Sequence, residues 1–176
     1  DELWVKASGC WLSDALKKNI FISVNYKNIL ANIDNQKPDP VSSEVIYSDL
    51  TKNFRPSIET TLHAIMPYKY VVHTHSINCI ANTISRQNLI LLKEKMNNLN
   101  WSLVAYTKPG LDLARKIRES LRPGVDTILM SNHGVVFGSD CINDLEKKIF
   151  DLEKRLHKPL RNINKSPKLK ELDWLE

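Results

Sequence analysis

A His-x-His pair at the end of an apolar run is the feature of this sequence with the clearest chemical consequence. His73 and His75 close the run 70–75. Side chains alternate across a strand, so both imidazoles would point to the same face of an extended segment. Both rings could then reach one ion, and imidazole is the commonest protein ligand for metals such as zinc. The pair is therefore a candidate metal site.

Two more residues supply the remaining parts of such a site. His133 lies in Asn132-His133-Gly134, and Glu59 precedes the pair on a predicted helix. Three histidines and a nearby carboxylate are the parts of a catalytic metal centre with an open position. Each residue also has an ordinary structural interpretation, as a core histidine or as a first-turn glutamate that favours the helix dipole. From the residues alone, both interpretations stay open.

The helix that carries Glu59 is predicted from the residues that would start and end it. Pro56-Ser57 opens it, Ser57 is the predicted N-cap, and Pro67 ends it. Its apolar face is predicted to consist of Ile58, Leu62, Ile65 and Met66. Glu59 is offset from that face, so we expect it to look into a cleft.

The histidines are expected at the ends of strands. The run 70–74 is apolar on both faces, which is typical of a central, buried strand, and the histidines lie at its exit. A tight link at 131–134 joins two further predicted strands, 127–130 and 135–137, and carries His133.

The remaining elements alternate between strand and helix. Strands are predicted at 3–7, 20–24 and 103–106, and helices at 28–33, 88–97, 111–121 and 143–157. The helix at 88–97 is expected to turn Leu89, Leu91, Leu92 and Met96 inward, and the last helix to bury Leu145, Ile149, Leu152 and Leu156. Alternation predicts an α/β domain, and the short links require antiparallel pairs in its sheet.

Composition narrows the class of protein. The chain has 176 residues, of which 42% are hydrophobic and 26% charged, which suits one compact domain. Three widely spaced cysteines favour reduced thiols in a cytoplasmic protein, and no apolar run approaches the length of a membrane span. Net charge is +5, with many of the basic residues after 153. A solvated helix face and a basic tail at 158–176 explain this charge better than nucleic-acid binding does.

Three motifs together carry a family resemblance. Pro56-Ser57-Ile58-Glu59, His73-Thr74-His75 and Asn132-His133-Gly134 resemble the class II aldolase/adducin head-domain family. That family includes the fuculose-phosphate and rhamnulose-phosphate aldolases and the ribulose-phosphate 4-epimerase. The segments 3–9 and 109–114 are similar to the aldolase part of rhamnulose-phosphate aldolase/dehydrogenase fusions. The resemblance runs from about residue 3 to about residue 155, and the expected domain is 1–157.

The resemblance implies a fold and a set of roles. The fold would be a three-layer α/β/α sandwich around a mixed, largely antiparallel central sheet. His73, His75 and His133 would hold a divalent metal, usually Zn²⁺, and Glu59 would be the general acid/base. Ser8, Gly9 and Ser57 fall where the family holds a substrate phosphate, and the assembly would be a homotetramer.

The sequence departs from the family pattern at two places where the family binds the substrate phosphate. Many aldolases have Ser-Ser-Glu where this chain has Ser57-Ile58-Glu59, and Ile58 cannot donate a hydrogen bond. The Gly-Asn-x-Ser loop of the family, expected before residue 1, is not in the sequence.

The predicted function is a metal-dependent class II aldolase-like lyase in the cytoplasm. It would cleave or form a C–C bond in a sugar phosphate or related hydroxy-ketone through a metal-stabilised enediolate. A sugar-phosphate 4-epimerase or a sugar-acid-phosphate decarboxylase would use the same site. A third possibility is a non-catalytic, adducin-like binding module, against which the complete set of histidines and Glu59 argues.

Overall fold

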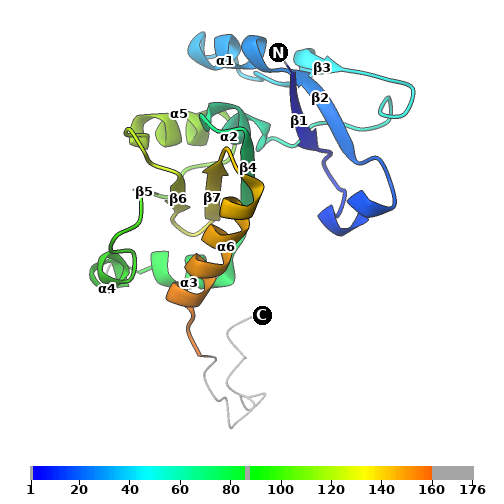
Figure 1. Cartoon of the computed structure of the whole chain (residues 1–176). Helices are drawn as coiled ribbons and strands as arrows, with labels where there is room; N and C mark the ends of the chain where they lie inside the picture. Colours follow the sequence, from blue (N-terminus) through cyan, green and yellow to red (C-terminus); the bar gives the residue numbers. More distant parts are fainter. Residues whose placement is uncertain (1, 86–87, 160–176) are drawn as a thin grey trace, which may run out of the picture.

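Two β-sheets form the framework of the computed structural model, which describes residues 2–85 and 88–159 (Figure 1). The first sheet has the order β1-β2-β3 and is antiparallel throughout; its strands are β1 (Glu2–Lys6), β2 (Phe21–Asn25) and β3 (Val45–Ile46). The second has the order β4-β7-β6-β5; its strands are β4 (Tyr70–Thr74), β5 (Trp101–Val104), β6 (Thr127–Met130) and β7 (Gly134–Ser139). Only β5 and β6 are parallel within the described sheets.

Helices cover both faces of the second sheet. The helices on one side are α2 (Thr60–Ile65) and α5 (Leu111–Ser120), and those on the other are α3 (Ile77–Thr83), α4 (Asn88–Lys95) and α6 (Ile142–Leu156). The remaining helix, α1 (Tyr26–Asp34), packs between the first sheet and the pair α2 and α5. Two 3-10 helices, η1 (Leu12–Leu16) and η2 (Ser42–Glu44), lie in the connections of the first sheet. The expected three-layer α/β/α class, with a mixed and largely antiparallel sheet, is confirmed.

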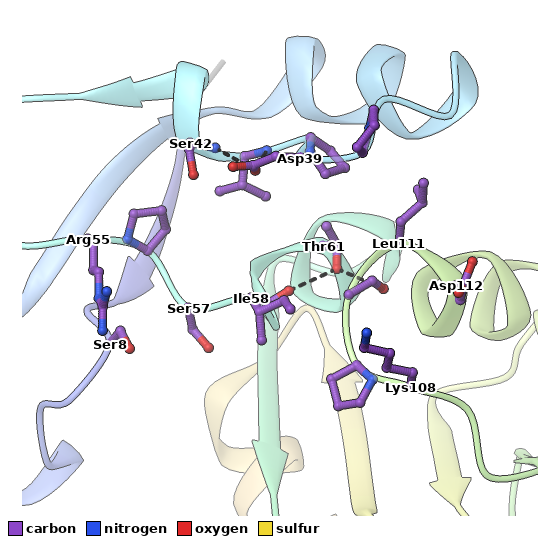
Figure 2. Close-up of a pocket in the computed structure, with 16 residues that line it drawn as sticks. Ser8, Asp39, Ser42, Arg55, Ser57, Ile58, Thr61, Lys108, Leu111 and Asp112 are labelled. Atoms are coloured by element: carbon purple, nitrogen blue, oxygen red, sulfur yellow. Dashed lines mark hydrogen bonds between the residues drawn. The ribbon is translucent and has the colours of Figure 1, made fainter.

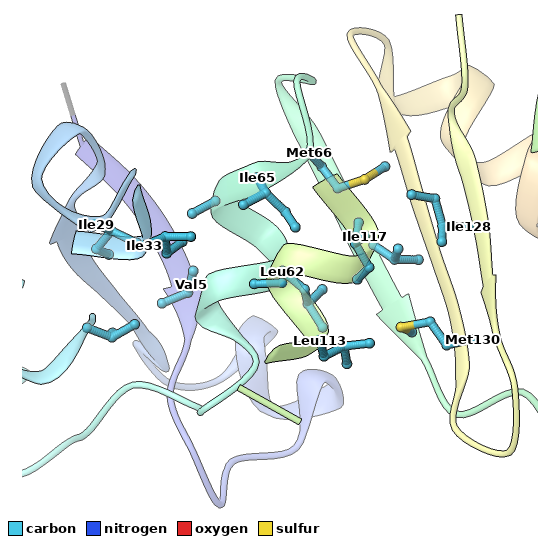
Figure 3. Close-up of a cluster of buried hydrophobic side chains, with 14 of the residues drawn as sticks. Val5, Ile29, Ile33, Leu62, Ile65, Met66, Leu113, Ile117, Ile128 and Met130 are labelled. Atoms are coloured by element: carbon cyan, nitrogen blue, oxygen red, sulfur yellow. The ribbon is translucent and has the colours of Figure 1, made fainter. Parts of the chain in front are cut away.

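Strand alternation divides the hydrophobic interior into two cores. On β6, Ile128 and Met130 face the first core, which Figure 3 shows, while Leu129 between them faces the second. Val136 on β7 likewise faces the first core, and its neighbours face the second. Period-two alternation therefore places an apolar layer on each side of the sheet, as a strand covered on both faces requires.

The predicted stripe of the last helix is confirmed. Leu145, Leu152 and Leu156 on α6 are buried in the second core, and Ile149 packs against it. Its N-cap is Cys141, whereas Asn143 or Asp144 was expected to cap the helix. The predicted basic tail lies, from residue 160 on, outside the described residues. In the described part, no helix has both the length and the apolar character needed to cross a membrane.

Three packing expectations were wrong. β4 is the edge strand of its described sheet rather than a central one, because β7 pairs with only one of its sides. Leu91 is exposed, whereas Leu89 and Leu92 of the same helix pack in the second core. Ile58 is 62% exposed, because the chain has not yet entered the helix at that residue.

The start of α2 also differs from its prediction. Its N-cap is Glu59, and the first helical residue is Thr60. Ser57 instead makes a turn before the helix, in which its Oγ accepts the Glu59 amide at 3.2 Å and its carbonyl accepts the Thr60 amide at 3.0 Å. This turn brings Glu59 to the very end of the helix, where its side chain projects beyond the helix.

Candidate metal centre

Four side chains from three separate parts of the chain meet at one point. Glu59 lies at the N-terminus of α2, His73 on β4, His75 one residue after β4, and His133 in the link between β6 and β7. The antiparallel pairing of β4 with β7 sets His73 opposite Val136. The link that carries His133 therefore lies beside the end of β4, where His75 follows.

The four groups converge on one carboxylate oxygen. Glu59 Oε1 lies 3.3 Å from Nε2 of His73, 3.4 Å from Nε2 of His75 and 3.1 Å from Nε2 of His133. The ring centroids of the three histidines are 4.8 to 5.0 Å apart. One ligand atom from each of the four residues lies within 4.8 Å of the others. The predicted site residues Glu59, His73, His75 and His133 are thus brought together.

The turn around His133 depends on two unusual backbone conformations. Asn132 has φ +54° and Gly134 has φ +153°. A Cβ at Gly134 would collide with the Thr74 carbonyl oxygen and would lie 3.0 Å from Cα of His75. Only glycine fits such a close approach of two backbones. The Asn-His-Gly motif is therefore a geometric requirement for placing His133 next to His75.

A hydrogen bond to a backbone carbonyl sets the ring orientation of His73. Its Nδ1 lies 2.9 Å from the Val135 carbonyl oxygen, which can only accept, so Nδ1 carries the proton. The lone pair is then on Nε2, which faces Glu59. This arrangement, a ligand imidazole whose other nitrogen donates to a carbonyl, is the usual one at metal sites.

Electrostatics favour a neutral His133 and an ionised Glu59. The neighbouring imidazoles, with the largest contribution from His73 and smaller ones from His133 and His75, lower the pKa of Glu59 to about 2 against the opposing effect of burial. Burial lowers the pKa of His133, although the Glu59 carboxylate acts the other way. At neutral pH, Glu59 is therefore negative and His133 is available as a ligand.

The residues fit a divalent metal ion. Nε2 of His73 is buried without a hydrogen-bond partner among the described residues, and the His73 side chain is only 5% exposed. A lone pair that points at a carboxylate oxygen is unfavourable unless a positive charge lies between them. Three neutral imidazole nitrogens and one carboxylate form a donor set that suits zinc and similar ions.

A cavity of about 720 Å³ is lined by Ser57 and Ile58, which directly precede Glu59, although Glu59 and the three histidines are not among its lining residues (Figure 2). Ser8 and Ser57, two of the predicted phosphate-binding residues, line it; Gly9, the third, is not among the lining residues. Gly9 adopts φ +77° directly after Ser8, whose amide already donates to the Arg55 carbonyl at 2.9 Å. The serine hydroxyls, rather than this backbone, are therefore turned to the cavity.

Sequence reasoning missed several lining residues. Arg55 and Lys108 bring two positive side chains to opposite parts of the cavity wall (Figure 2). Both precede a proline that leads into a motif, Pro56-Ser57 and Pro109-Gly110, and that position could have identified them. On the other side of Glu59, the Thr60 hydroxyl is buried and lacks a hydrogen-bond partner in the described structure. A buried threonine gives no signal in the sequence.

Comparison with known proteins places the chain in a family. The model of the class II aldolase and adducin N-terminal domain matches residues 1–157. The chain belongs to this family. YuxG of Bacillus subtilis (strain 168), an uncharacterized oxidoreductase, is 33% identical over 139 residues, which make up 76% of this chain and 20% of YuxG. The class II aldolase domain of this chain thus spans about a fifth of the length of that relative.

Solved structures share the fold of this class II aldolase domain. The N-terminal class II aldolase domain of a conserved protein from Thermoplasma acidophilum has a TM-score of 0.74 at 23% identity, covering 88% of this chain and 73% of that one. A sugar-phosphate aldolase from Thermotoga maritima has a TM-score of 0.63 at 19% identity, covering 88% and 68%. The predicted family and fold class are therefore confirmed.

Proposed function

We propose that this chain is a metal-dependent class II aldolase-like lyase acting on a sugar phosphate or a related hydroxy-ketone. The observation that carries the proposal is the convergence of three Nε2 atoms and one half-buried carboxylate at a single point. A binding module has no need of such an arrangement, whereas a carbon–carbon lyase does. Family membership and the sugar-phosphate aldolase from Thermotoga maritima support the same reaction class.

The three histidines would hold the ion, which we propose to be zinc. Their neutral rings leave its double charge uncompensated, and a bound ion supplies a Lewis acid that stabilises negative charge on the substrate oxygens. The Val135 carbonyl fixes the ring of His73, and the strand pairing fixes the distance between His73 and the turn of His133.

Glu59 is the proposed general acid/base. Its low pKa keeps it ionised, so it can accept a proton from the carbon next to the substrate carbonyl and return it. Its position at the end of α2 lets the carboxylate reach the ligand atoms while the helix stays packed in the first core. No other carboxylate in the described part of the chain joins the histidine group.

The cavity of Ser8 and Ser57 is the proposed place of the substrate's anionic end. The serine hydroxyls donate hydrogen bonds there, with Gly9 leaving room beside Ser8. Arg55 and Lys108 add positive charge, which offsets the loss of a donor at Ile58. We also propose, from the family resemblance, a homotetramer that acts in the cytoplasm.

The first test is elemental analysis of the purified protein beside the variant His73→Ala. We expect about one divalent ion per chain, lost in the variant. Metal-loaded protein is then incubated with a panel of ketose phosphates, and aldehyde release is measured. Product analysis separates cleavage from epimerisation and decarboxylation. A bound ion without turnover of any substrate would instead support a binding module.

A further inference from the structure

A second cavity, of about 370 Å³, opens directly on the candidate metal centre. Glu59 and His73 both line it, whereas neither lines the larger cavity of Ser8 and Arg55. Its volume is within the range of sites that bind small molecules. The proposed function has not yet given this cavity an occupant, although a substrate held at the centre can extend into it.

Apolar side chains form most of the wall of this cavity. They come from β1, β2, η1, β4 and α6, and among them are Leu3, Val5, Leu12, Phe21, Ile142 and Leu145. Such a wall stabilises a guest by removing its apolar surface from water. A polyol would lose hydrogen bonds to water there without replacing them.

The two lysines that line the cavity are engaged with groups of the protein itself. Lys6 Nζ donates to the carbonyl oxygens of Ala7 at 3.1 Å and Cys10 at 2.8 Å. Lys69 Nζ lies 5.3 Å from the centroid of the Tyr70 ring, in a cation–π contact. Neither ammonium group is therefore a ready partner for an anion, and the wall suits an uncharged guest.

The polar groups that α2 adds to the wall lie close to Glu59 in the sequence. Thr60 is 1% exposed, and its hydroxyl has no hydrogen-bond partner in the described structure. A buried hydroxyl without a partner is unfavourable, and an oxygen atom of a guest would supply one. His63, one turn further along, is neutral at pH 7 because burial lowers its pKa to about 4. The wall thus offers hydrogen bonds from α2 and apolar contacts from the elements around it.

Ser57 connects this cavity to the larger one. It is the one described residue that lines both, and its Oγ accepts the Glu59 amide at 3.2 Å. The two cavities therefore meet at the segment that leads into Glu59. A substrate whose anionic end lies with Ser8 and Arg55 would have its reacting carbons at Glu59 and its other end in the apolar cavity.

We propose that the apolar cavity binds the aldehyde half of the substrate, which is therefore a hydroxy-ketone with an aliphatic or aromatic end in place of a polyol. The inference deepens the proposed function and rests on it for the reaction. In cleavage, the bond between the carbon beside the ketone and the hydroxyl-bearing carbon breaks. Its electron pair stays on the ketone half, which later takes up a proton at that carbon. The hydroxyl gives up its own proton and becomes the carbonyl of an apolar aldehyde.

Isoamyl alcohol has the form of such an aldehyde half, and its binding requires neither metal nor turnover. By ligand-observed NMR on the metal-free protein, we expect saturable binding with a Kd of about 1 mM, as for the burial of an aliphatic chain of this size. Glycerol should not bind at the same concentrations. Equal binding of the two alcohols would overturn the proposal.

Two matched pairs of variants locate the binding. Phe21→Trp fills part of the cavity, and Phe21 belongs to neither core, so we expect a folded protein that binds isoamyl alcohol about tenfold more weakly. Phe150→Trp, at a 67% exposed position of α6 outside this cavity, should bind normally. Leu12→Asn should weaken binding and Leu16→Asn should not, because both lie on η1 but only Leu12 lines the cavity. Circular dichroism establishes that each variant is folded, and unchanged binding in both Phe21→Trp and Leu12→Asn would contradict the assigned cavity.

The reverse reaction of the metal-loaded protein measures the same preference in catalysis. With dihydroxyacetone phosphate as the ketone, we expect kcat/KM for isovaleraldehyde to exceed that for glyceraldehyde by about tenfold to a hundredfold. Phe21→Trp should reduce this ratio through KM and leave the reaction of acetaldehyde intact. Addition to glyceraldehyde alone would overturn the inference and support the proposed function. Binding of isoamyl alcohol with the expected variant pattern, but no addition to any aldehyde, would instead contradict the proposed function and leave the apolar preference of the cavity in place.

Discussion

Glu59 is a carboxylate whose surroundings are arranged to keep it charged. Three imidazoles lie within 3.4 Å of one of its oxygens, and the carboxylate belongs to a helix end rather than to a loop. Through the hydrogen bond with Nε2 of His133 at 3.1 Å, Glu59 connects the end of α2 to the link between β6 and β7. The same residue therefore serves the stability of the site and, in the proposed reaction, the proton transfer.

The variant Glu59→Gln separates these two roles. An amide has nearly the same shape but cannot accept a proton, so we expect kcat to fall by a factor of about 10² to 10⁴. Metal content should remain near one ion per chain, because the three histidines are intact. Steady-state kinetics and elemental analysis on the same preparation provide the check. A variant that keeps its kcat would show that another group moves the proton.

The pH dependence of stability is predicted to report on His63. Burial lowers the pKa of His63 to about 4 in the folded protein from 6.5. Between these values the unfolded chain binds a proton that the folded chain does not, so stability is complete above pH 6.5 and decreases toward pH 4. The decrease is up to about 3 kcal/mol. Glu59 acts in a lower window: its stabilisation is present above pH 4.5 and is lost as the pH falls toward 2.

Urea denaturation of metal-free protein between pH 7.5 and 4 measures this slope. The variant His63→Gln should flatten it, whereas His157→Gln, an exposed control, should not. An unchanged slope in His63→Gln would assign the effect to other groups.

At the scale of elements, the identity of the site could be predicted from the sequence, but its geometry could not. The His-x-His spacing and the Asn-His-Gly turn are local patterns, and each strand or helix that carries them was predicted close to its observed bounds. The order of strands in the sheet depends on contacts between segments that are far apart in the sequence. The run 70–74 begins with three consecutive apolar residues, 70–72, because α2 and α6 pack against this edge strand, and the same pattern is typical of a central strand.

The start of α2 shows a second limit. Ser57 has the character of an N-cap, but a turn of two residues delays the helix until Glu59. Propensity could not distinguish these two starts, because both satisfy the first amides of the helix. A helix that was capped by Ser57 would place Glu59 inside its first turn. The observed start places Glu59 at the N-cap instead, where its carboxylate reaches the histidines. Tertiary contacts with β4 supply that information, and they are absent from any local pattern.

Gly134 is the element-scale position most sensitive to change. In Gly134→Ala the new methyl group would meet the Thr74 carbonyl oxygen, so β7 would have to separate from the end of β4. We expect a loss of about 2 kcal/mol or more in stability, together with loss of zinc binding. Gly124→Ala is the matched control: it also has positive φ, but its Cβ meets nothing within 4 Å, so only the backbone cost of about 1 kcal/mol applies. Comparable losses in both variants would contradict the steric explanation.

At the scale of the molecule, the metal centre lies where independent parts of the fold meet. The helix with Glu59 belongs to the first core, whereas the link with His133 joins strands that both cores cover. No single core therefore defines the centre. Both layers of helices must be in place on the sheet before the four side chains can meet.

The position of β7 has a consequence for the time at which the candidate metal centre can form. β7 is the last strand in the described sequence, yet it lies inside the sheet between β4 and β6. During synthesis, Glu59, His73 and His75 leave the ribosome long before His133, and the strand that aligns them follows later still. A nascent chain that ends before His133 has three of the four groups, and it lacks β7, which pairs with β4. The complete set of four side chains can therefore come together only after β7 has been released.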